Sequence, residues 1–432
     1  MATTLAWAWT GGVDQMGLPL GRLGDPTVSV PVGSASADPD LATPQLEPLS
    51  PVPDPSATAS ASASASAPAL TSASALATAA AAAARVGGTP LTPTDTGLVV
   101  AAPPAEVPPA DPAGRSRRCY AGPNLVPTCG VLWGVAPGAH TESRGASALA
   151  RFERKTGRHQ AIYHAYHGGV RQLFPTPQEI AIAREPGKKR ILFLNWKPES
   201  TSWANIAKGD RRTDAYLDRL AAHINRNFHE RFFFAVHHEG ENDVRPRAGS
   251  GYTARDYAAM YRHVINRLRA RGVDNMVSVL VHMAYVKHAQ QSWFNTMYPG
   301  DDVVDWIGLD TYAYSDPGYG HSNFAGILNR QIDGKPGWPG FYTWAATRHS
   351  SKPLMIAEWG VWSSKRNTRY KADFYRELGD ELRKFPRIKA MVQFETPHNQ
   401  KGQDSSVDST PQALRAYRDL GRLPIFQVSV AR

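Results

Sequence analysis

Short apolar runs alternate with longer amphipathic segments from Cys129 to the end of the chain. This alternation predicts parallel β-strands joined by α-helices, because each helix must return the chain to the edge where the previous strand began. Eight such strand-and-helix units indicate a closed (β/α)8 barrel, the TIM barrel. The runs with the length and apolar content of a strand are Gly130 to Gly134, Ala161 to Ala165, Arg190 to Trp196, Arg231 to His238, Met276 to His282, Val303 to Thr311, Pro353 to Glu358 and Ile388 to Glu395.

The competing α/β architecture is a doubly wound open sheet. That fold usually has a Gly-rich phosphate-binding turn after an early strand, and neither G-x-G-x-x-G nor G-x-x-x-x-G-K-[ST] occurs in this chain. The stretch from Tyr314 to Trp344 is rich in Gly and Tyr, so we expect it to be an extended loop at the barrel mouth. The helices expected between the strands include Thr176 to Arg184, Thr213 to Asn227, Thr253 to Arg271, Tyr370 to Phe385 and Pro411 to Leu420.

The chain divides into two parts of different composition. Residues 1–115 are of low complexity, and Ser56 to Ala84 consists almost entirely of Ala, Ser, Thr and Pro. Such a segment has too little apolar surface to offset its ordering entropy, so we expect a disordered stalk or linker. A transient helix through Ala79 to Ala84 is the alternative. Residues 116–432 have the length and composition of one barrel, which would be the catalytic domain.

The net charge of +10 conceals a difference between these parts, because residues 1–115 are acidic and the remainder is strongly basic. A basic domain raises the prospect of an anionic partner. Its basic residues are spread along expected helices without interleaved aromatics, which favours a solvated surface, and no nucleic-acid partner is expected. The chain has no long, strongly apolar segment, so no membrane span is expected.

Cys119 and Cys129 are the two cysteines of the chain. They are close enough in sequence to close a small loop as a disulfide, which would imply an oxidising compartment, or they are two unrelated thiols. The first basic residue is Arg22, so the basic start of a standard secretory signal is missing. We nevertheless expect an extracellular or cell-surface monomer.

Two glutamates end expected strands and carry the strongest chemical signal. Glu239 follows the very apolar run Phe232 to His238, and Glu358 follows Leu354 to Ala357. The carboxyl ends of barrel strands meet at one face, so the two carboxylates would converge there as a glycosidase acid and nucleophile. Glu241 is the competing acid. Tyr312, at the end of another strand, is placed to donate a hydrogen bond to an ionised Glu358.

Other groups near these glutamates allow different interpretations. His237, Glu239 and His282 resemble the two-histidine, one-carboxylate iron site of oxygenases, but those enzymes are typically antiparallel β proteins, so no metal or other cofactor is expected. Tryptophans near expected strand ends suit stacking on sugar rings, although any single tryptophan more often belongs to the core. These tryptophans are Trp133, Trp196, Trp306, Trp359 and Trp362.

Three sequence motifs resemble those of glycoside hydrolase family 26: His238-Glu239, Asp305 to Tyr312 and Lys352 to Gly360. The resemblance extends roughly from Cys129 to the C-terminus. The resemblance implies that Glu239 is the acid/base and Glu358 the nucleophile of a retaining enzyme, with carboxylates about 5–5.5 Å apart. It also implies supporting roles for His238 and Tyr312. From the stacking argument above we expect Trp196 and Trp359 to bind the substrate, and Phe394 is a further stacking residue.

The family resemblance implies a β-mannan substrate, with β-xylan or mixed-linkage β-glucan as alternatives. Mannanases of the family usually follow the acid with Asn-Gly and a tryptophan, whereas this chain reads Gly240 to Arg245 as Gly-Glu-Asn-Asp-Val-Arg. Strand eight ends at Gln393-Phe394-Glu395, where a tryptophan platform is usual. The expected function is a retaining endo-β-glycosidase. The alternatives are a catalytically silent glycan-binding barrel and, less favoured, the metal oxygenase.

Overall fold

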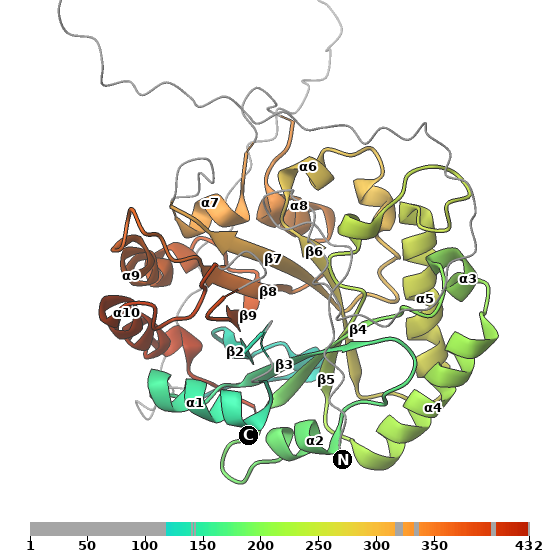
Figure 1. The fold of residues 1–432 in the computed structure, drawn as a ribbon, viewed down its shortest axis with the longest axis horizontal. Helices are drawn as coiled ribbons and strands as arrows, with labels where there is room; N and C mark the ends of the chain where they lie inside the picture. Colours follow the sequence, from blue (N-terminus) through green and yellow to red (C-terminus); the bar gives the residue numbers. More distant parts are fainter. Residues whose placement is uncertain are drawn as a thin grey trace, which may run out of the picture. The chain divides into compact units, whose positions relative to one another are not determined.

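The computed structural model describes residues 118–139, 141, 144–315, 323–331, 337–398 and 403–430. Eight parallel strands close into a barrel in chain order, and the last pairs with the first, as the sequence predicts (Figure 1). The stalk or linker expected over residues 1–115 lies outside the described residues. The barrel strands are β2 (Leu132–Pro137), β3 (Ile162–Gly168), β4 (Ile191–Lys197), β5 (Phe232–Val236), β6 (Met276–Met283), β7 (Trp306–Ala313), β8 (Leu354–Val361) and β9 (Ile388–Glu395).

The observed strands match the eight expected runs with small shifts at their ends. One of these shifts has a clear backbone cause: β2 was expected from Gly130 but begins at Leu132. Gly130 has a φ of +71°, a left-handed conformation that extended strand backbone does not adopt. A Cβ atom on Gly130 would also lie 2.4 Å from the carbonyl oxygen of Ile425. The chain therefore turns tightly here before the strand starts.

Helices surround the barrel, and all five expected helices are present (Figure 1). Thr176 and Thr253 each form a capping box at the start of a helix, with Glu179 and Asp256 as the reciprocal partners. The helices are α1 (Ala146–Thr156), α2 (Pro177–Ala183), α3 (Trp203–Ala207), α4 (Arg211–Asn227), α5 (Ala254–Ala270), α6 (Val286–Ala289), α7 (Phe324–Leu328), α8 (Phe341–Arg348), α9 (Tyr370–Leu382) and α10 (Pro411–Gly421).

The extended loop expected from Tyr314 to Trp344 is wrong in part, because α7 lies inside it and α8 begins inside it. The Asn323 side chain caps α7 by accepting a hydrogen bond from the Gly326 amide. Phe324 is fully buried, as are Ile327 and Leu328. Burial of this apolar face stabilises a helix too short to persist alone. Residues 316–322 and 332–336 of the stretch lie outside the described residues.

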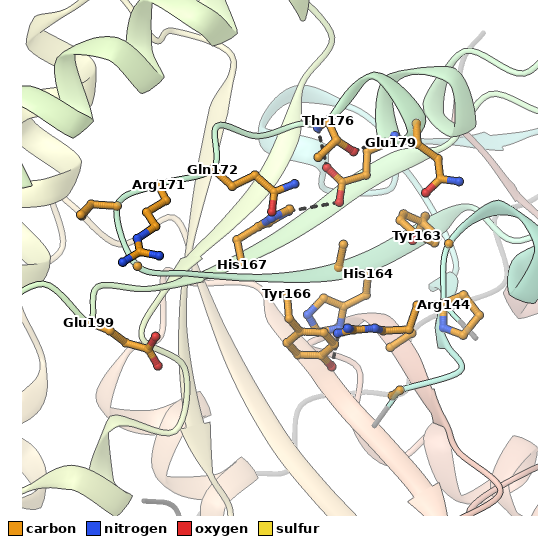
Figure 2. A pocket seen from close by; sticks show the side chains of 18 of the residues that line it. Arg144, Tyr163, His164, Tyr166, His167, Arg171, Gln172, Thr176, Glu179 and Glu199 are labelled. Carbon is orange, nitrogen blue, oxygen red and sulfur yellow. Dashed lines mark hydrogen bonds and ion pairs between the residues drawn. The ribbon is translucent and has the colours of Figure 1, made fainter. Parts of the chain in front are cut away.

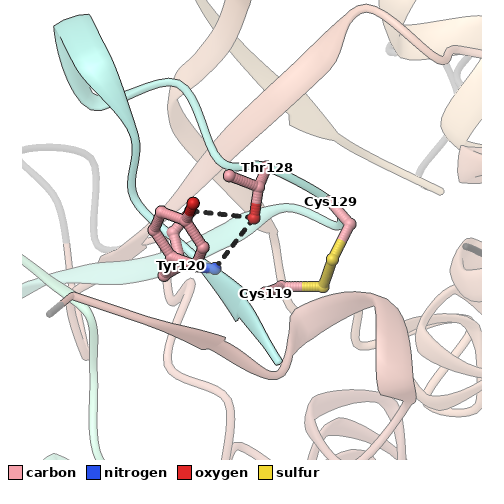
Figure 3. Close-up of a disulfide and its surroundings, with 4 residues drawn as sticks. All are labelled: Cys119, Tyr120, Thr128 and Cys129. Carbon is pink, nitrogen blue, oxygen red and sulfur yellow. Dashed lines mark hydrogen bonds between the residues drawn. A yellow bond between two sulfur atoms is a disulfide. The ribbon is translucent and has the colours of Figure 1, made fainter. Parts of the chain in front are cut away.

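Cys119 and Cys129 form a disulfide, with their Cα atoms 5.1 Å apart, so the predicted pairing is confirmed (Figure 3). The loop that they close includes the short helix η1 (Pro123–Leu125), whose Leu125 packs against side chains inside the barrel. The Trp306 indole, in the first position of β7, donates a hydrogen bond to the carbonyl of Asn124. This loop therefore covers the N-terminal end of the barrel. No described helix has the length and apolarity that crossing a membrane requires.

Candidate active site

Glu239 lies in an unusual turn just beyond β5. His237 and Glu239 have φ values of +48° and +51°, which non-glycine residues rarely adopt, and Glu239 caps the 3-10 helix η2 (Gly240–Asp243). The buried Tyr257 hydroxyl donates to the carbonyls of Val236 and His237 at 3.2 and 3.1 Å. A Cβ atom on Gly240 would lie 2.3 Å from the Tyr257 ring, so glycine is needed there. The packing around this turn thus stabilises its strained backbone, which fixes the position of Glu239.

Glu358, in β8, is held by two tyrosines. Tyr166 donates to its Oε1 atom and Tyr312 to its Oε2 atom, both at 2.7 Å, and the Nε2 atom of His238 lies 3.8 Å from Oε1. Burial raises the pKa of Glu358 to about 7, while the two hydroxyls oppose that rise by stabilising the carboxylate. Both oxygens are therefore positioned as an ionised nucleophile requires.

The hydrogen bond from Tyr312 was expected from the sequence, whereas Tyr166 was missed. Tyr166 comes from β3, and 192 positions separate it from Glu358. The available signal was a polar pair, His164 and Tyr166, spaced two residues apart near the end of an expected strand. Burial raises the pKa of both tyrosines well above the ordinary value, so both hydroxyls keep the proton that they donate.

Glu239 differs from Glu358 in its surroundings. Its Oε2 atom accepts a hydrogen bond of 3.1 Å from the Asn242 side chain. Burial raises the pKa of Glu239 well above its ordinary value, and the negative charges of Glu358 and Glu241 raise it further. The negative charge of Glu358 thus favours the protonated form of Glu239, while the two tyrosine hydroxyls favour the ionised form of Glu358. Two neighbouring carboxyl groups in opposite protonation states can serve as general acid and nucleophile.

Glu241, the competing acid, faces a different partner. Its Oε1 atom is hydrogen-bonded to Nδ1 of His282, which is on β6, and Glu241 is buried. Glu239 is half-buried and is therefore more exposed to solvent than Glu241. Exposure and hydrogen bonding therefore favour Glu239 as the group that can reach a glycosidic oxygen.

The metal site considered for His237, Glu239 and His282 does not form. His237 accepts a hydrogen bond from the Trp203 indole at 3.1 Å through Nδ1, and its Nε2 atom lies 2.8 Å from an Asp243 carboxylate oxygen. Both ring nitrogens are thus occupied. His282 in turn is bonded to Glu241. The contacts of His237 and of Nδ1 of His282 therefore do not match a set of metal ligands, and they do not support the oxygenase interpretation.

A different group has the spacing of a cation site. Potential ligand atoms of His238, Asp310 and Glu358 lie within 4.8 Å of one another. Both oxygens of Glu358 already accept tyrosine hydrogen bonds. Burial and the nearby charge of Glu358 raise the pKa of Asp310 well above its ordinary value, which favours a neutral carboxylic acid. A neutral acid beside a carboxylate that two hydroxyls already hold fits a proton-sharing cluster better than a set of metal ligands.

Trp196 and Trp359 do not face the site, so their expected role in sugar stacking is wrong. Both are fully buried. The Trp196 ring stacks on Tyr216 of α4, with centroids 5.5 Å apart, and Trp359 packs against Trp133 at 5.5 Å. Side chains alternate along a strand, and Trp359 follows the inward-pointing Glu358, so it points to the helices. Trp133 and Trp306 are fully buried as well.

Other aromatic side chains pack beside Glu358. The Trp362 ring stacks on Tyr312, with centroids 5.0 Å apart, and Phe394 meets Tyr312 edge-on at 5.8 Å. Together with Tyr314 they belong to one small apolar cluster. Phe394 was expected near the substrate from the sequence, and the structure places it next to a tyrosine that contacts Glu358.

A pocket of about 810 Å³ opens beside this site, over the ends of β2, β3 and β4 (Figure 2). Tyr166 belongs to the pocket wall and also donates to Glu358. His164, next to it in the wall, stacks on Phe193 with ring centroids 4.1 Å apart. The pocket and the carboxyl pair thus share one side chain, so a long ligand bound at Glu358 can extend into the pocket.

We expect Tyr312→Phe to move the acidic limb of the kcat/KM profile to higher pH, by about one unit. The lost hydroxyl stabilises ionised Glu358, so its removal raises the pKa of Glu358, and a higher pH is then needed to ionise this carboxyl group. The pH dependence of kcat/KM measures the shift. Tyr375→Phe is the matched control, because this buried hydroxyl has no hydrogen-bond partner among the described residues. An unchanged acidic limb in Tyr312→Phe would contradict the assigned contact.

Residues 204–330 match the model of glycosyl hydrolase family 26. Over 284 residues the chain is 26% identical to Endoglucanase H of Acetivibrio thermocellus, covering 63% of this chain and 29% of that protein. Over 109 residues it is 30% identical to the β-1,3-xylanase TXYA of a Vibrio species, covering 25% of this chain and 20% of that protein.

Among solved structures, a family 26 β-mannanase from Bacteroides ovatus is similar with a TM-score of 0.48 and 15% identity, covering 70% of this chain and 91% of that one. The chain spans less than a third of the length of the curated relatives named above. The segment matched by the family model contains Glu239 and Tyr312, and Glu358 lies beyond it.

Proposed function

We propose that this chain, which belongs to glycoside hydrolase family 26, is a retaining endo-β-glycosidase that cleaves a β-linked polysaccharide. The observation that carries the proposal is the pair of unequal carboxyl groups at the ends of β5 and β8. Glu358 accepts two tyrosine hydrogen bonds, and the pKa of Glu239 is raised by burial and by the charge of Glu358. These are the properties that a nucleophile and a general acid need.

The reaction proceeds in two displacements. A carboxylate oxygen of Glu358 attacks the anomeric carbon while Glu239 gives its proton to the departing glycosidic oxygen, so one C–O bond forms as another breaks. Glu239, now ionised, removes a proton from water. The resulting hydroxide equivalent attacks the same carbon and releases Glu358, and the product keeps the original anomeric configuration. Tyr166 and Tyr312 hold Glu358 in place throughout the first step.

For the substrate we propose a β-mannan first, with β-xylan and mixed-linkage β-glucan as alternatives. The alternatives are kept because the segment after Glu239, Gly240 to Asp243, has the sequence Gly-Glu-Asn-Asp. It lacks the Asn-Gly and the tryptophan of the family's mannanases. The curated relatives are named as an endoglucanase and a β-1,3-xylanase. We also propose an extracellular location, supported by the disulfide between Cys119 and Cys129, because disulfides persist in oxidising compartments.

The proposed activity is tested with a panel of β-1,4-mannan, β-1,4-xylan, β-1,3-xylan and mixed-linkage β-glucan. We expect one polymer to lose viscosity well before most of its reducing ends appear, as internal cleavage requires. Proton NMR of the first product should show the β-anomer before mutarotation. First appearance of the α-anomer would contradict retention. Binding without cleavage of any polymer, unchanged in Glu358→Ala, would identify a silent glycan-binding barrel instead.

A further inference from the structure

The pocket beside the active site carries an unusual set of charges. Its lining includes three arginines, Arg144, Arg171 and Arg212, which come from the segments after β2, β3 and β4. All three are exposed, and within the part of the chain that the structure describes none has an ion pair or a side-chain hydrogen bond. The arginines are therefore available to a ligand in the pocket.

The acidic side chains of the pocket do not cancel these charges. Glu179 lies 3.1 Å from Nε2 of His167 and accepts a 2.7 Å hydrogen bond from the Thr176 amide, so it is already occupied. Glu199, at an exposed position, is the remaining carboxyl group of the lining. Three unpaired guanidinium groups thus outnumber one free carboxyl group in the pocket lining, and the pocket attracts anions.

The position of the pocket connects this charge to catalysis. In Figure 2 the Arg144 side chain extends toward Tyr166, while Arg171 and Glu199 lie on the other side of that tyrosine. Tyr166 donates to the carboxylate of Glu358. A sugar chain whose anomeric carbon lies at Glu358 would therefore carry neighbouring residues past Tyr166 and among the arginines.

We propose that this pocket is a subsite for an anionic substituent, a carboxylate or a sulfate ester, on the polysaccharide that the enzyme cleaves. The inference rests on the proposed function and specifies its substrate class. Guanidinium groups suit this role, because their planar fork of N–H donors matches the two oxygens of a carboxylate or sulfate. Trp362 and Phe394, which pack around Tyr312, carry no charge, so the pocket adds selection for substituted chains.

The test measures binding with the Glu358→Gln protein, so that it does not depend on turnover. Isothermal titration calorimetry compares glucuronoxylan with the same polymer after reduction of its carboxyl groups, and a sulfated β-mannan and a sulfated mixed-linkage β-glucan each with its unsulfated parent. We expect the anionic member of at least one pair to bind about tenfold more tightly, the scale of a charge-assisted hydrogen-bonded pair. The pair that shows the preference identifies the carboxylate or the sulfate as the ligand.

Variants of the pocket then locate the preference. Arg144→Gln, Arg171→Gln and Arg212→Gln should each reduce the ratio of the two affinities, and the triple variant should bring it near one. Glu199→Gln should increase the ratio, because it removes the opposing charge, and a loss of folding could not produce that increase. Raising the ionic strength from about 0.01 M to about 0.15 M should reduce the preference.

Arg211→Gln is the matched control, because Arg211 is the exposed neighbour of Arg212 on α4, loses the same charge and does not line the pocket. The proposal would be overturned if Arg211→Gln reduced the ratio of anionic to neutral polymer affinity as much as the pocket variants do. An unchanged affinity ratio in the triple variant would also overturn it. Equal or absent binding of both members of each pair would do the same. Cleavage of neutral polymers without a charge preference overturns the subsite alone, whereas a charge preference without any cleavage overturns the enzymatic function alone.

Discussion

Glu358→Ala is expected to lower kcat by about 10⁴-fold or more, the scale on which loss of a covalent nucleophile acts in hydrolases. The carboxylate accepts hydrogen bonds from Tyr166 and Tyr312, and no other described carboxylate is held in this way by two tyrosines. Without it the anomeric carbon has no protein nucleophile. Initial rates on the polymer found in the substrate panel measure the loss.

Added azide provides the decisive control for this variant. The small anion fits the space left by the missing carboxylate and attacks the anomeric carbon from the same face, so it should restore turnover and give an α-glycosyl azide. NMR of the product reports that configuration. An azide product in the β-configuration, or retention of most activity by Glu358→Ala, would exclude Glu358 as the nucleophile.

The variant Glu358→Gln separates a catalytic from a structural effect. The pKa of Glu358 is raised to about 7 in the folded protein, so between its ordinary value of 4.5 and about 7 the folded state binds more protons than the unfolded state. Wild-type stability therefore falls as the pH rises through this window. The glutamine does not titrate, so Glu358→Gln should become progressively more stable than the wild type over the same range in thermal unfolding.

The sequence predicted the barrel well because each of its strands is a short apolar run between amphipathic helices. Glu239 and Glu358 were found for a related reason, since each breaks such a run at the end where barrel sites form. The predicted start of β2 was wrong because the backbone conformation of Gly130 determines it. Gly130 has a positive φ and lies against the carbonyl of Ile425, and neither property can be predicted from the local sequence.

Side-chain direction was the main property that the sequence could not give. All eight residues of β8 are buried, so polarity does not distinguish its inward from its outward face. A shift of one residue exchanges the two faces, which is why Trp359 was expected in the cleft and lies under the helices. Tyr166 was missed because its role depends on contact with Glu358, a residue from a strand on another part of the barrel.

Glu239→Ala is expected to lower kcat/KM on the natural polymer by about 10²- to 10⁴-fold, the usual contribution of a general acid. A sugar oxygen is a poor leaving group and needs the proton that Glu239 supplies. A 2,4-dinitrophenyl glycoside has a leaving group that departs without protonation, so the variant should form its glycosyl-enzyme at close to the wild-type rate. Stopped-flow absorbance at the dinitrophenolate band measures this first step.

The same variant should hydrolyse its glycosyl-enzyme slowly, because water has lost its general base. Azide needs no deprotonation, so it should accelerate this second step and give a β-glycosyl azide, opposite in configuration to the product from Glu358→Ala.

Glu241→Gln provides the comparison. The charge of Glu241 helps to raise the pKa of Glu239, so its loss should lower that pKa and move the basic limb of kcat/KM to lower pH, because Glu239 must be protonated to act. If Glu241→Gln instead showed the leaving-group dependence and the azide rescue, the general acid would be Glu241, and the hydrogen bond between Glu241 and His282 would have to open during turnover.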